Sequence, residues 1–133
     1  MVFTAAELAY LRSQRLGRLA TVAPNGRLHN NPVGFRVDAE AGVIDIGGRM
    51  MGASQKFGNV AANGNVAFVV DDVPSIDPWT TRCVEVRGHA EALTGQRPRG
   101  GYLSAEIIRI HPVRIISWGL GPEGREGSKR TVG

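Results

Sequence analysis

Residues 84–92 alternate between two kinds of side chain, and this alternation is the strongest constraint on the fold. Small or apolar residues occupy every second position, and charged residues or histidine occupy the positions between them. Because side chains of a β-strand point alternately to opposite faces, the pattern predicts a strand with one buried and one exposed face. The first set is Val84, Val86, Gly88 and Ala90, and the second is Glu85, Arg87, His89 and Glu91.

Two further pairs of short apolar runs predict antiparallel hairpins. Residues 19–22 and 28–33 flank Pro24-Asn25-Gly26, whose Asn-Gly pair tolerates the positive φ angles of a tight turn. Residues 33–37 and 43–46 lie in the same way on either side of a turn-rich segment. Since the second hairpin follows the first directly, we expect the strands to continue as a meander.

Two more strands are predicted in the second half of the chain. The apolar run 66–70 predicts a strand that ends at Asp71, and residues 106–118 predict a long strand. Pro112 interrupts the long strand and cannot donate a hydrogen bond to a neighbouring strand. We therefore expect a sheet edge or a bulge at this position.

Two short helices complete the expected architecture. Thr4 and Glu7 form a capping-box pattern that predicts a helix reaching about Gln14, and a second helix is predicted over residues 54–63. Six to seven antiparallel strands with two short helices indicate a mainly β, α+β fold built as a small barrel. At this length we expect residues 1–133 to form a single domain, with residues 118–133 as an extended C-terminal tail.

The start of the helix predicted over residues 54–63 carries the clearest functional signal. Ser54 is placed to cap this helix, and Lys56 lies in its first turn. A cation is unfavourable there, because the free backbone N–H groups already make that end of a helix positive. A phosphate held by those N–H groups, Ser54, Lys56 and nearby Arg49 would remove the conflict. The alternative is that Lys56 is a solvated surface lysine.

Composition argues against several classes of protein. The single cysteine, Cys83, rules out an intrachain disulfide framework, and a reducing cytoplasm is the expected location. The net charge of +4 suits an anionic ligand, but the chain has no DNA-binding motif and no basic stripe interleaved with aromatics. We therefore expect no nucleic-acid partner. No stretch approaches the roughly 20 apolar residues of a membrane span, so no span is expected.

The usual catalytic and metal-binding motifs are also absent from the sequence. No serine lies in a G-x-S-x-G elbow, which argues against hydrolysis. His29, His89 and His111 lack the close spacing of metal ligands, so we interpret them as structural or surface residues and predict no metal site. A haem or metal ligand is the minor alternative. Cys83 has no partner thiol and is expected to be inert.

Several residues have the chemistry to contact a flat ring. Trp79 and Trp118 each lie next to a turn or strand end, where a tryptophan packs across a barrel mouth, joins a subunit contact, or forms a wall beside a ligand ring. Asn30-Asn31-Pro32 places two side-chain amides at the end of a strand. Such amides can orient a polar ring, and they can also simply cap turns.

The order of several motifs resembles one known family. Residues 17–22 read Gly-Arg-Leu-Ala-Thr-Val, Pro32-Val33-Gly34-Phe35 follows the first turn, and Ser54-Gln55-Lys56 stands before a valine-rich strand. With residues 84–91, this order resembles the pyridoxamine 5′-phosphate oxidase-like split β-barrel family. Within that family it is most similar to the actinobacterial reductases that use the deazaflavin coenzyme F420. The resemblance spans nearly residues 8–118 and implies an FMN-binding type of split barrel.

The resemblance also implies where a cofactor binds. It implies a homodimer with two cofactor sites at the subunit interface, each holding a flavin or a deazaflavin. Ser54 and Lys56 match the positions that hold the cofactor phosphate in the family. The full set of residues expected at the cofactor is Asn30, Asn31, Pro32, Gly48, Arg49, Ser54, Gln55, Lys56, Asn59 and Trp79.

Two departures from the family pattern bear on which cofactor is used. Gln55 stands where arginine is common in the flavin mononucleotide (FMN) oxidases, and Phe35 stands where they carry a basic residue. Both departures favour coenzyme F420, whose long anionic oligoglutamate tail would suit Arg49 and Lys56. We therefore expect an enzyme that transfers a hydride between F420 and a small organic acceptor, with catalytic residues that the sequence does not identify. An FMN-binding oxidoreductase and a non-catalytic flavin- or haem-binding protein are the alternatives.

Overall fold

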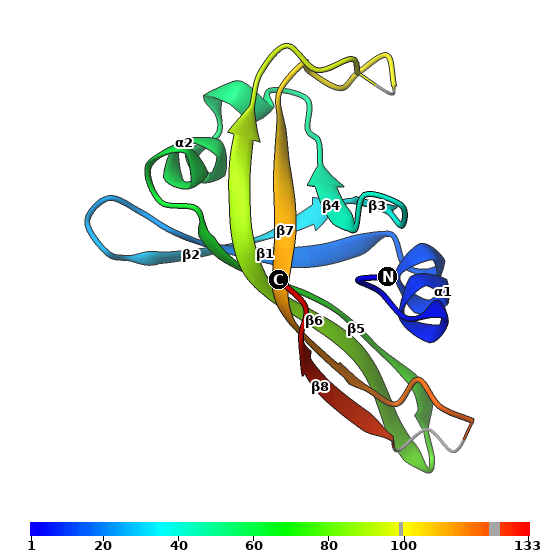
Figure 1. The fold of residues 1–133 in the computed structure, drawn as a ribbon. Helices are drawn as coiled ribbons and strands as arrows, with labels where there is room; N and C mark the ends of the chain where they lie inside the picture. The colour runs from blue at the N-terminus through cyan, green and yellow to red at the C-terminus, as the bar shows by residue number, and fades with distance from the viewer. Residues whose placement is uncertain (99, 123–125) are drawn as a thin grey trace.

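The computed structural model of the protein describes residues 1–98, 100–122 and 126–133, which form one antiparallel sheet with short helices. The strands follow the order β2-β1-β5-β6-β7-β4-β3, and β8 pairs with β7 (Figure 1). This mainly β architecture confirms the predicted fold class. The elements in chain order are α1 (Ala5–Ser13), β1 (Leu16–Val22), β2 (Leu28–Gly34), β3 (Arg36–Asp38), β4 (Val43–Ile46), the 3₁₀ helix η1 (Met51–Ala53), α2 (Gln55–Ala62), β5 (Asn65–Ile76), β6 (Trp79–Leu93), β7 (Ile107–Trp118) and β8 (Gly127–Thr131).

The capping box predicted at the first helix is present. The Thr4 hydroxyl accepts a hydrogen bond from the Glu7 amide at 3.1 Å, and the Glu7 carboxylate accepts one from the Thr4 amide at 2.9 Å. These two bonds satisfy backbone donors that have no partner inside the helix. Across the described parts of the chain, no helix has both the length and the apolar character needed to cross a membrane.

The predicted alternation along residues 84–92 is confirmed in β6. Val84, Val86 and Ala90 are buried, whereas Arg87 and His89 between them are exposed. The buried side chains join a core contributed by the inner face of the sheet and by α1. Removing this apolar surface from water supplies the main driving force for folding.

Both predicted hairpins form, but they do not continue as a meander. The β1–β2 turn uses positive φ at Gly26 alone, because Asn25 keeps a negative φ. The second hairpin, β3–β4, does not pair with β2 and instead lies at the other end of the strand order, next to β7. Matching of apolar faces explains this arrangement, since Ile44 and Ile46 align with fully buried isoleucines of β7.

The predicted end of a strand at Asp71 is wrong, because β5 continues to Ile76 and pairs with a longer β6. Asp72 explains the extension. Its carboxylate accepts two hydrogen bonds from Arg82 on β6, at 3.0 and 2.6 Å, and one from the Tyr10 hydroxyl on α1 at 2.8 Å. The sequence suggested that the charge of Asp72 would end the strand. In the structure this carboxylate instead connects the β5–β6 hairpin to α1.

Of the two possibilities considered for Pro112, the bulge is correct. β7 is not an edge strand, since it pairs with β6 on one side and with β4 and β8 on the other. Gly88 pairs with Pro112 and Arg87 pairs with Arg114, so Val113 is the extra residue of the bulge. A side chain at Gly88 would overlap the carbonyl oxygen of His111, so the close approach of the strands requires glycine there.

The predicted extended tail over residues 118–133 is also wrong in its second half, because residues 127–131 form an eighth strand, β8, paired with β7. Arg130 fixes this strand to the start of the chain. Its guanidinium donates hydrogen bonds of 2.6 Å to both carboxylate oxygens of Glu7 and one of 2.6 Å to the Val2 carbonyl. The segment is polar and shows no strand pattern, so its sequence did not predict this strand. An ion pair with Glu7, far away in the sequence, stabilises it.

We expect the Glu7–Arg130 ion pair to contribute strongly to stability. The Glu7 side chain is only 2% exposed, so Arg130→Leu leaves a buried carboxylate without its partner. Loss of one member of a buried pair typically costs about 3 kcal/mol or more, and urea denaturation at neutral pH measures the change in the free energy of unfolding. Lys129→Leu, on the exposed face of the same strand, is the matched control and should change it by less than about 0.5 kcal/mol. Equal effects of the two substitutions would contradict the assignment.

The same ion pair makes a prediction about pH. Burial raises the pKa of Glu7, but the hydrogen bonds from Arg130 and Thr4 outweigh burial and hold the pKa below its ordinary value of 4.5. A lowered carboxylate pKa stabilises the fold above that value, and this stabilisation is lost as the pH falls through the folded-state pKa. The stability difference between the wild-type protein and Arg130→Leu should therefore narrow as the pH is lowered below 4.5.

Candidate functional site

The predicted second helix is present as α2, and Ser54 caps it as expected. The Ser54 hydroxyl accepts a hydrogen bond from the Phe57 amide at 3.3 Å and donates one to the Met51 carbonyl at 2.6 Å. The amides of Gln55 and Lys56 point out of the helix start, where no carbonyl of the helix itself can accept from them. The first turn of α2 contains no acidic residue. This helix end therefore presents free donors and positive charge.

Lys56 and Arg49 are the charged side chains that the sequence places at this helix start. Lys56 is half-buried, and neither residue forms an ion pair with any described residue. The guanidinium carbon of Arg49 lies 5.9 Å from the centre of the Tyr102 ring, within the range of a cation–π contact. The two cations are thus available to an anionic group that approaches the start of α2.

Ser104 holds the segment between β4 and α2 in place. Its amide and its hydroxyl donate to the Gly48 carbonyl at 2.8 and 3.1 Å, and its hydroxyl accepts from the Met51 amide at 3.0 Å. Gly48 itself is half-buried. The sequence analysis missed Ser104, because the contact joins residues more than fifty positions apart.

The side chains of Asn59 and Gln55 form hydrogen bonds with other residues of the same chain. Asn59 is completely buried, donates to the Thr21 hydroxyl at 3.0 Å, and accepts from the Gln55 side-chain amide at 2.8 Å. Its side-chain nitrogen also lies 3.3 Å from Nδ1 of His29. Asn59 therefore fixes α2 against β1 and β2, and the structure does not turn its amide toward Ser54 and Lys56.

This contact also changes the buried face expected for α2. Phe57, Val60 and Ala61 have the i, i+3, i+4 spacing that predicts the buried face of an amphipathic helix, but the buried residues are Asn59 and Val60. Phe57 is only half-buried and Ala61 is exposed. A buried amide takes the place of an apolar side chain here because its hydrogen-bonding groups find partners on the sheet and on α2.

The other predicted residues lie on β2 and at the end of the β5–β6 hairpin. Asn30, Asn31 and Pro32 are exposed on β2, which is hydrogen-bonded only to β1. Trp79 is 66% exposed and pairs with Ile76 at the tip of the hairpin. Figure 1 shows this tip and α2 at opposite ends of the molecule. Within one copy of the chain, Trp79 is therefore far from Ser54 and Lys56.

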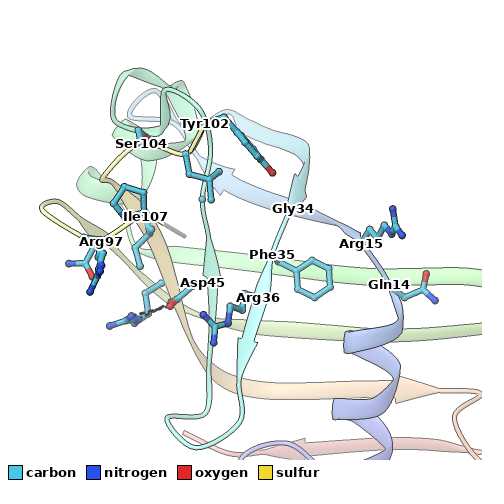
Figure 2. Close-up of a pocket in the computed structure, with 15 residues that line it drawn as sticks. Gln14, Arg15, Gly34, Phe35, Arg36, Asp45, Arg97, Tyr102, Ser104 and Ile107 are labelled. Carbon is cyan, nitrogen blue, oxygen red and sulfur yellow. Dashed lines mark hydrogen bonds and ion pairs between the residues drawn. The ribbon is translucent and has the colours of Figure 1, made fainter. Parts of the chain in front are cut away.

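A pocket of about 620 Å³ lies beside the helix start, on the outer face of β3, β4 and β7. Arg36, Asp45 and Arg109 form a row across these strands, because they are cross-strand neighbours and their flanking residues face the core. Figure 2 shows the loop residue Arg97 on the side of Asp45, Tyr102 toward Ser104, and Phe35 and Arg15 on the opposite side. Several lining residues are far apart in the sequence, so only the strand order reveals the pocket.

Positive charge dominates this pocket. Arg109 donates two hydrogen bonds to the Asp45 carboxylate, at 2.8 and 3.0 Å, and this pairing raises the pKa of Arg109. Asp45 is the only carboxylate among the lining residues described, and Arg109 occupies both of its oxygens. Arg15, Arg36 and Arg97 are left without an ion pair to any part of the chain that the structure describes.

Cys83 behaves as an ordinary half-buried thiol. Burial, together with the carboxylates of Asp71 and Glu85, raises the pKa of Cys83. A raised pKa keeps the thiol protonated near neutral pH, and a protonated thiol is a poor nucleophile. The expectation of an inert cysteine is consistent with this environment.

Comparison with known sequences places this geometry in a family. A family model described as pyridoxamine 5′-phosphate oxidase matches residues 3–131. A curated relative, the 5a,11a-dehydrotetracycline/5a,11a-dehydrooxytetracycline reductase of Streptomyces rimosus, is 55% identical over 121 residues, which cover 90% of this chain and 85% of the relative.

Solved structures agree with this placement. A conserved hypothetical protein of Mycobacterium tuberculosis is 24% identical and covers 98% of this chain and 92% of its own, with a TM-score of 0.71. An F420 reductase is 26% identical and covers 74% of this chain and 86% of its own, with a TM-score of 0.57. The match of the family model along nearly the whole chain, supported by the split-barrel fold, shows that the protein belongs to the pyridoxamine 5′-phosphate oxidase family.

Proposed function

We propose that the protein is a reductase that uses reduced coenzyme F420 to transfer a hydride to a conjugated, ring-containing acceptor. The observation that carries this proposal is the 55% identity with a dehydrotetracycline reductase along 90% of the chain. Reduction of a carbon–carbon double bond requires one hydride and one proton. The bound deazaflavin would supply the hydride, while the protein supplies position and a site that excludes water.

The start of α2 fits the phosphate of such a cofactor. The amides of Gln55 and Lys56 have no carbonyl of their own helix to donate to. The first turn lacks an acid, and Lys56 has no ion pair among the described residues. Free helix N–H groups and a lysine together form a favourable environment for a phosphate. Arg49 would contact a neighbouring anionic group of the same molecule.

Two side chains favour F420 over FMN. Gln55 donates its side-chain amide to Asn59 at 2.8 Å, so it is held along the helix rather than toward the helix start. The Phe35 ring packs edge-on against Phe68, with ring centres 5.2 Å apart. Neither position carries the cation that the FMN oxidases have there. FMN would therefore lose two of its favourable contacts in this protein.

We further propose that the active form is a homodimer with each cofactor at the subunit interface. Ile76 is 79% exposed and Trp79 is 66% exposed, at the tip of a hairpin that extends away from the core. Large apolar side chains exposed side by side favour contact with another surface. A second copy would cover them and would place Trp79 near a cofactor held by its partner.

The cofactor assignment is tested by titration of the purified protein. We expect colourless preparations that quench the fluorescence of added F420 and that catalyse F420H2-dependent reduction of a dehydrotetracycline. Yellow preparations that contain stoichiometric FMN and do not respond to F420 would instead support the FMN oxidoreductase. Binding of a cofactor without reduction of any acceptor would support a carrier protein.

Lys56→Ala should weaken F420 binding by about ten- to a hundredfold, because it removes a charge-assisted hydrogen bond worth roughly 1.5–3 kcal/mol. Without cofactor, the variant should be as stable as the wild type or more stable by at most ~1 kcal/mol, because a cation leaves the positive end of a helix. Fluorescence titration and thermal denaturation measure the two effects. Lys129→Ala removes the only other lysine in the sequence and serves as the control, with unchanged affinity. Unchanged affinity in Lys56→Ala would reject the phosphate site.

The dimer is tested by sedimentation. We expect the wild-type protein to sediment as a dimer at micromolar concentration, and Ile76→Asp to shift it toward monomer and to abolish F420 binding, because a buried unpaired charge is costly. Leu28→Asp changes a leucine that is 78% exposed on β2 and should leave the dimer intact. A wild-type monomer that still binds F420 would contradict this part of the proposal.

A further inference from the structure

The pocket on the outer face of β3, β4 and β7 has the features of a second binding site, separate from the start of α2. Arg15, Arg36 and Arg97 reach it from three different parts of the chain: the α1–β1 junction, β3 and the loop after β6. Like charges around one concavity repel each other unless an anion joins them. None of the three has an ion pair with a described residue, so the charge of the pocket is uncompensated.

The rest of the wall is apolar and partly aromatic. Phe35, Tyr102, Leu103 and Ile107 line the same space as the arginines (Figure 2). Aromatic and aliphatic walls bind the faces of flat ring systems, while a few charged groups fix their orientation. The volume of about 620 Å³ lies within the range of small-molecule sites, which is roughly 300–1,000 Å³.

The pocket and the start of α2 share one structural element. Ser104 lines the pocket, and its hydroxyl also binds the Gly48 carbonyl and the Met51 amide, at 3.1 and 3.0 Å, in the segment that leads into α2. Arg49 contacts the Tyr102 ring from that same segment. A cofactor anchored at the start of α2 and a ligand in the pocket would therefore be neighbours.

We infer that this pocket binds the acceptor, as a flat ring system whose anionic group is held by Arg36 and Arg97. The inference rests on the proposed reductase function and adds to it the place and the chemical class of the acceptor. Arg36 lies in the row of Arg36, Asp45 and Arg109, where Arg109 already occupies the Asp45 carboxylate. Arg97 of the loop after β6 lines the same pocket, on the side of Asp45 (Figure 2). The rings would lie against Phe35, Leu103 and Ile107.

The test uses oxytetracycline, a fluorescent ring compound with acidic enol groups, as the binding probe without any cofactor. We expect fluorescence anisotropy to show binding to the wild-type protein, and an increase in Kd of about tenfold in each of Arg36→Ala and Arg97→Ala. Arg36→Lys should recover part of the loss because it keeps the charge. Arg27→Ala, at an exposed arginine in the β1–β2 turn, is the matched control and should bind like the wild type.

Affinity for F420 separates this inference from the proposed function. The two arginine variants should bind F420 as the wild type does, and Lys56→Ala should bind oxytetracycline as the wild type does. Oxytetracycline affinity that is unchanged in both arginine variants would overturn the inference even if F420H2-dependent reduction proceeds. Weakened F420 affinity with unchanged oxytetracycline affinity would also overturn it and would assign the pocket to the cofactor tail. Arginine-dependent oxytetracycline binding without any hydride transfer would support the pocket and reject the reductase.

Discussion

The antiparallel pairing of β6 with β7 is the contact on which the rest of the structure depends. β6 carries β5 on its other side, and β7 carries both β4 and β8. The bulge at Val113 shifts the register of this pair beside Gly88, and the pairing continues on both sides of it. Residues 107–110 of β7 then face two ways, with buried isoleucines toward the core and Ile107 and Arg109 toward the pocket. The same strand thus supports both the core and the proposed acceptor site.

Helix α1 binds two segments that extend from this centre, β8 and the outer part of the β5–β6 hairpin. Glu7 binds Arg130 of β8, and Tyr10 binds Asp72 of the β5–β6 hairpin. Burial and the hydrogen bond to Asp72 raise the pKa of Tyr10, so its hydroxyl remains a donor in this contact near neutral pH. Arg82 lies over the Tyr10 ring, 5.1 Å from its centre, and completes the cluster. Hydrogen bonds from α1 therefore hold both β8 and the outer part of the β5–β6 hairpin, in addition to its apolar contacts with the core.

The sequence predicted those features of the fold that depend on residues close together in the chain. The capping box at Thr4, the turn at Gly26 and the cap of α2 at Ser54 each depend on a few neighbouring residues, and all are present. The bulge beside Pro112 is also present, but it further requires Gly88 on the neighbouring strand. The eighth strand and the position of β3–β4 depend on partners far along the chain, so no local pattern reveals them. The family resemblance places Asn59 at the cofactor, whereas the structure buries its side chain against Thr21 of β1, which is distant in the sequence. The pocket needs the strand order as well, because its residues come from segments that are adjacent only after folding.

The Ser104 contact has a consequence for how an enzyme on this scaffold can change its acceptor. Residues 96–98, 102 and 103 line the pocket and belong to no helix or strand, whereas Ser104 itself holds the segment that leads into α2. Insertions or substitutions before Ser104 can reshape this side of the pocket, while the start of α2, the proposed phosphate site, keeps its position. Duplicated copies of such a gene could thus diverge toward different ring compounds while all draw hydride from one shared cellular pool of reductant.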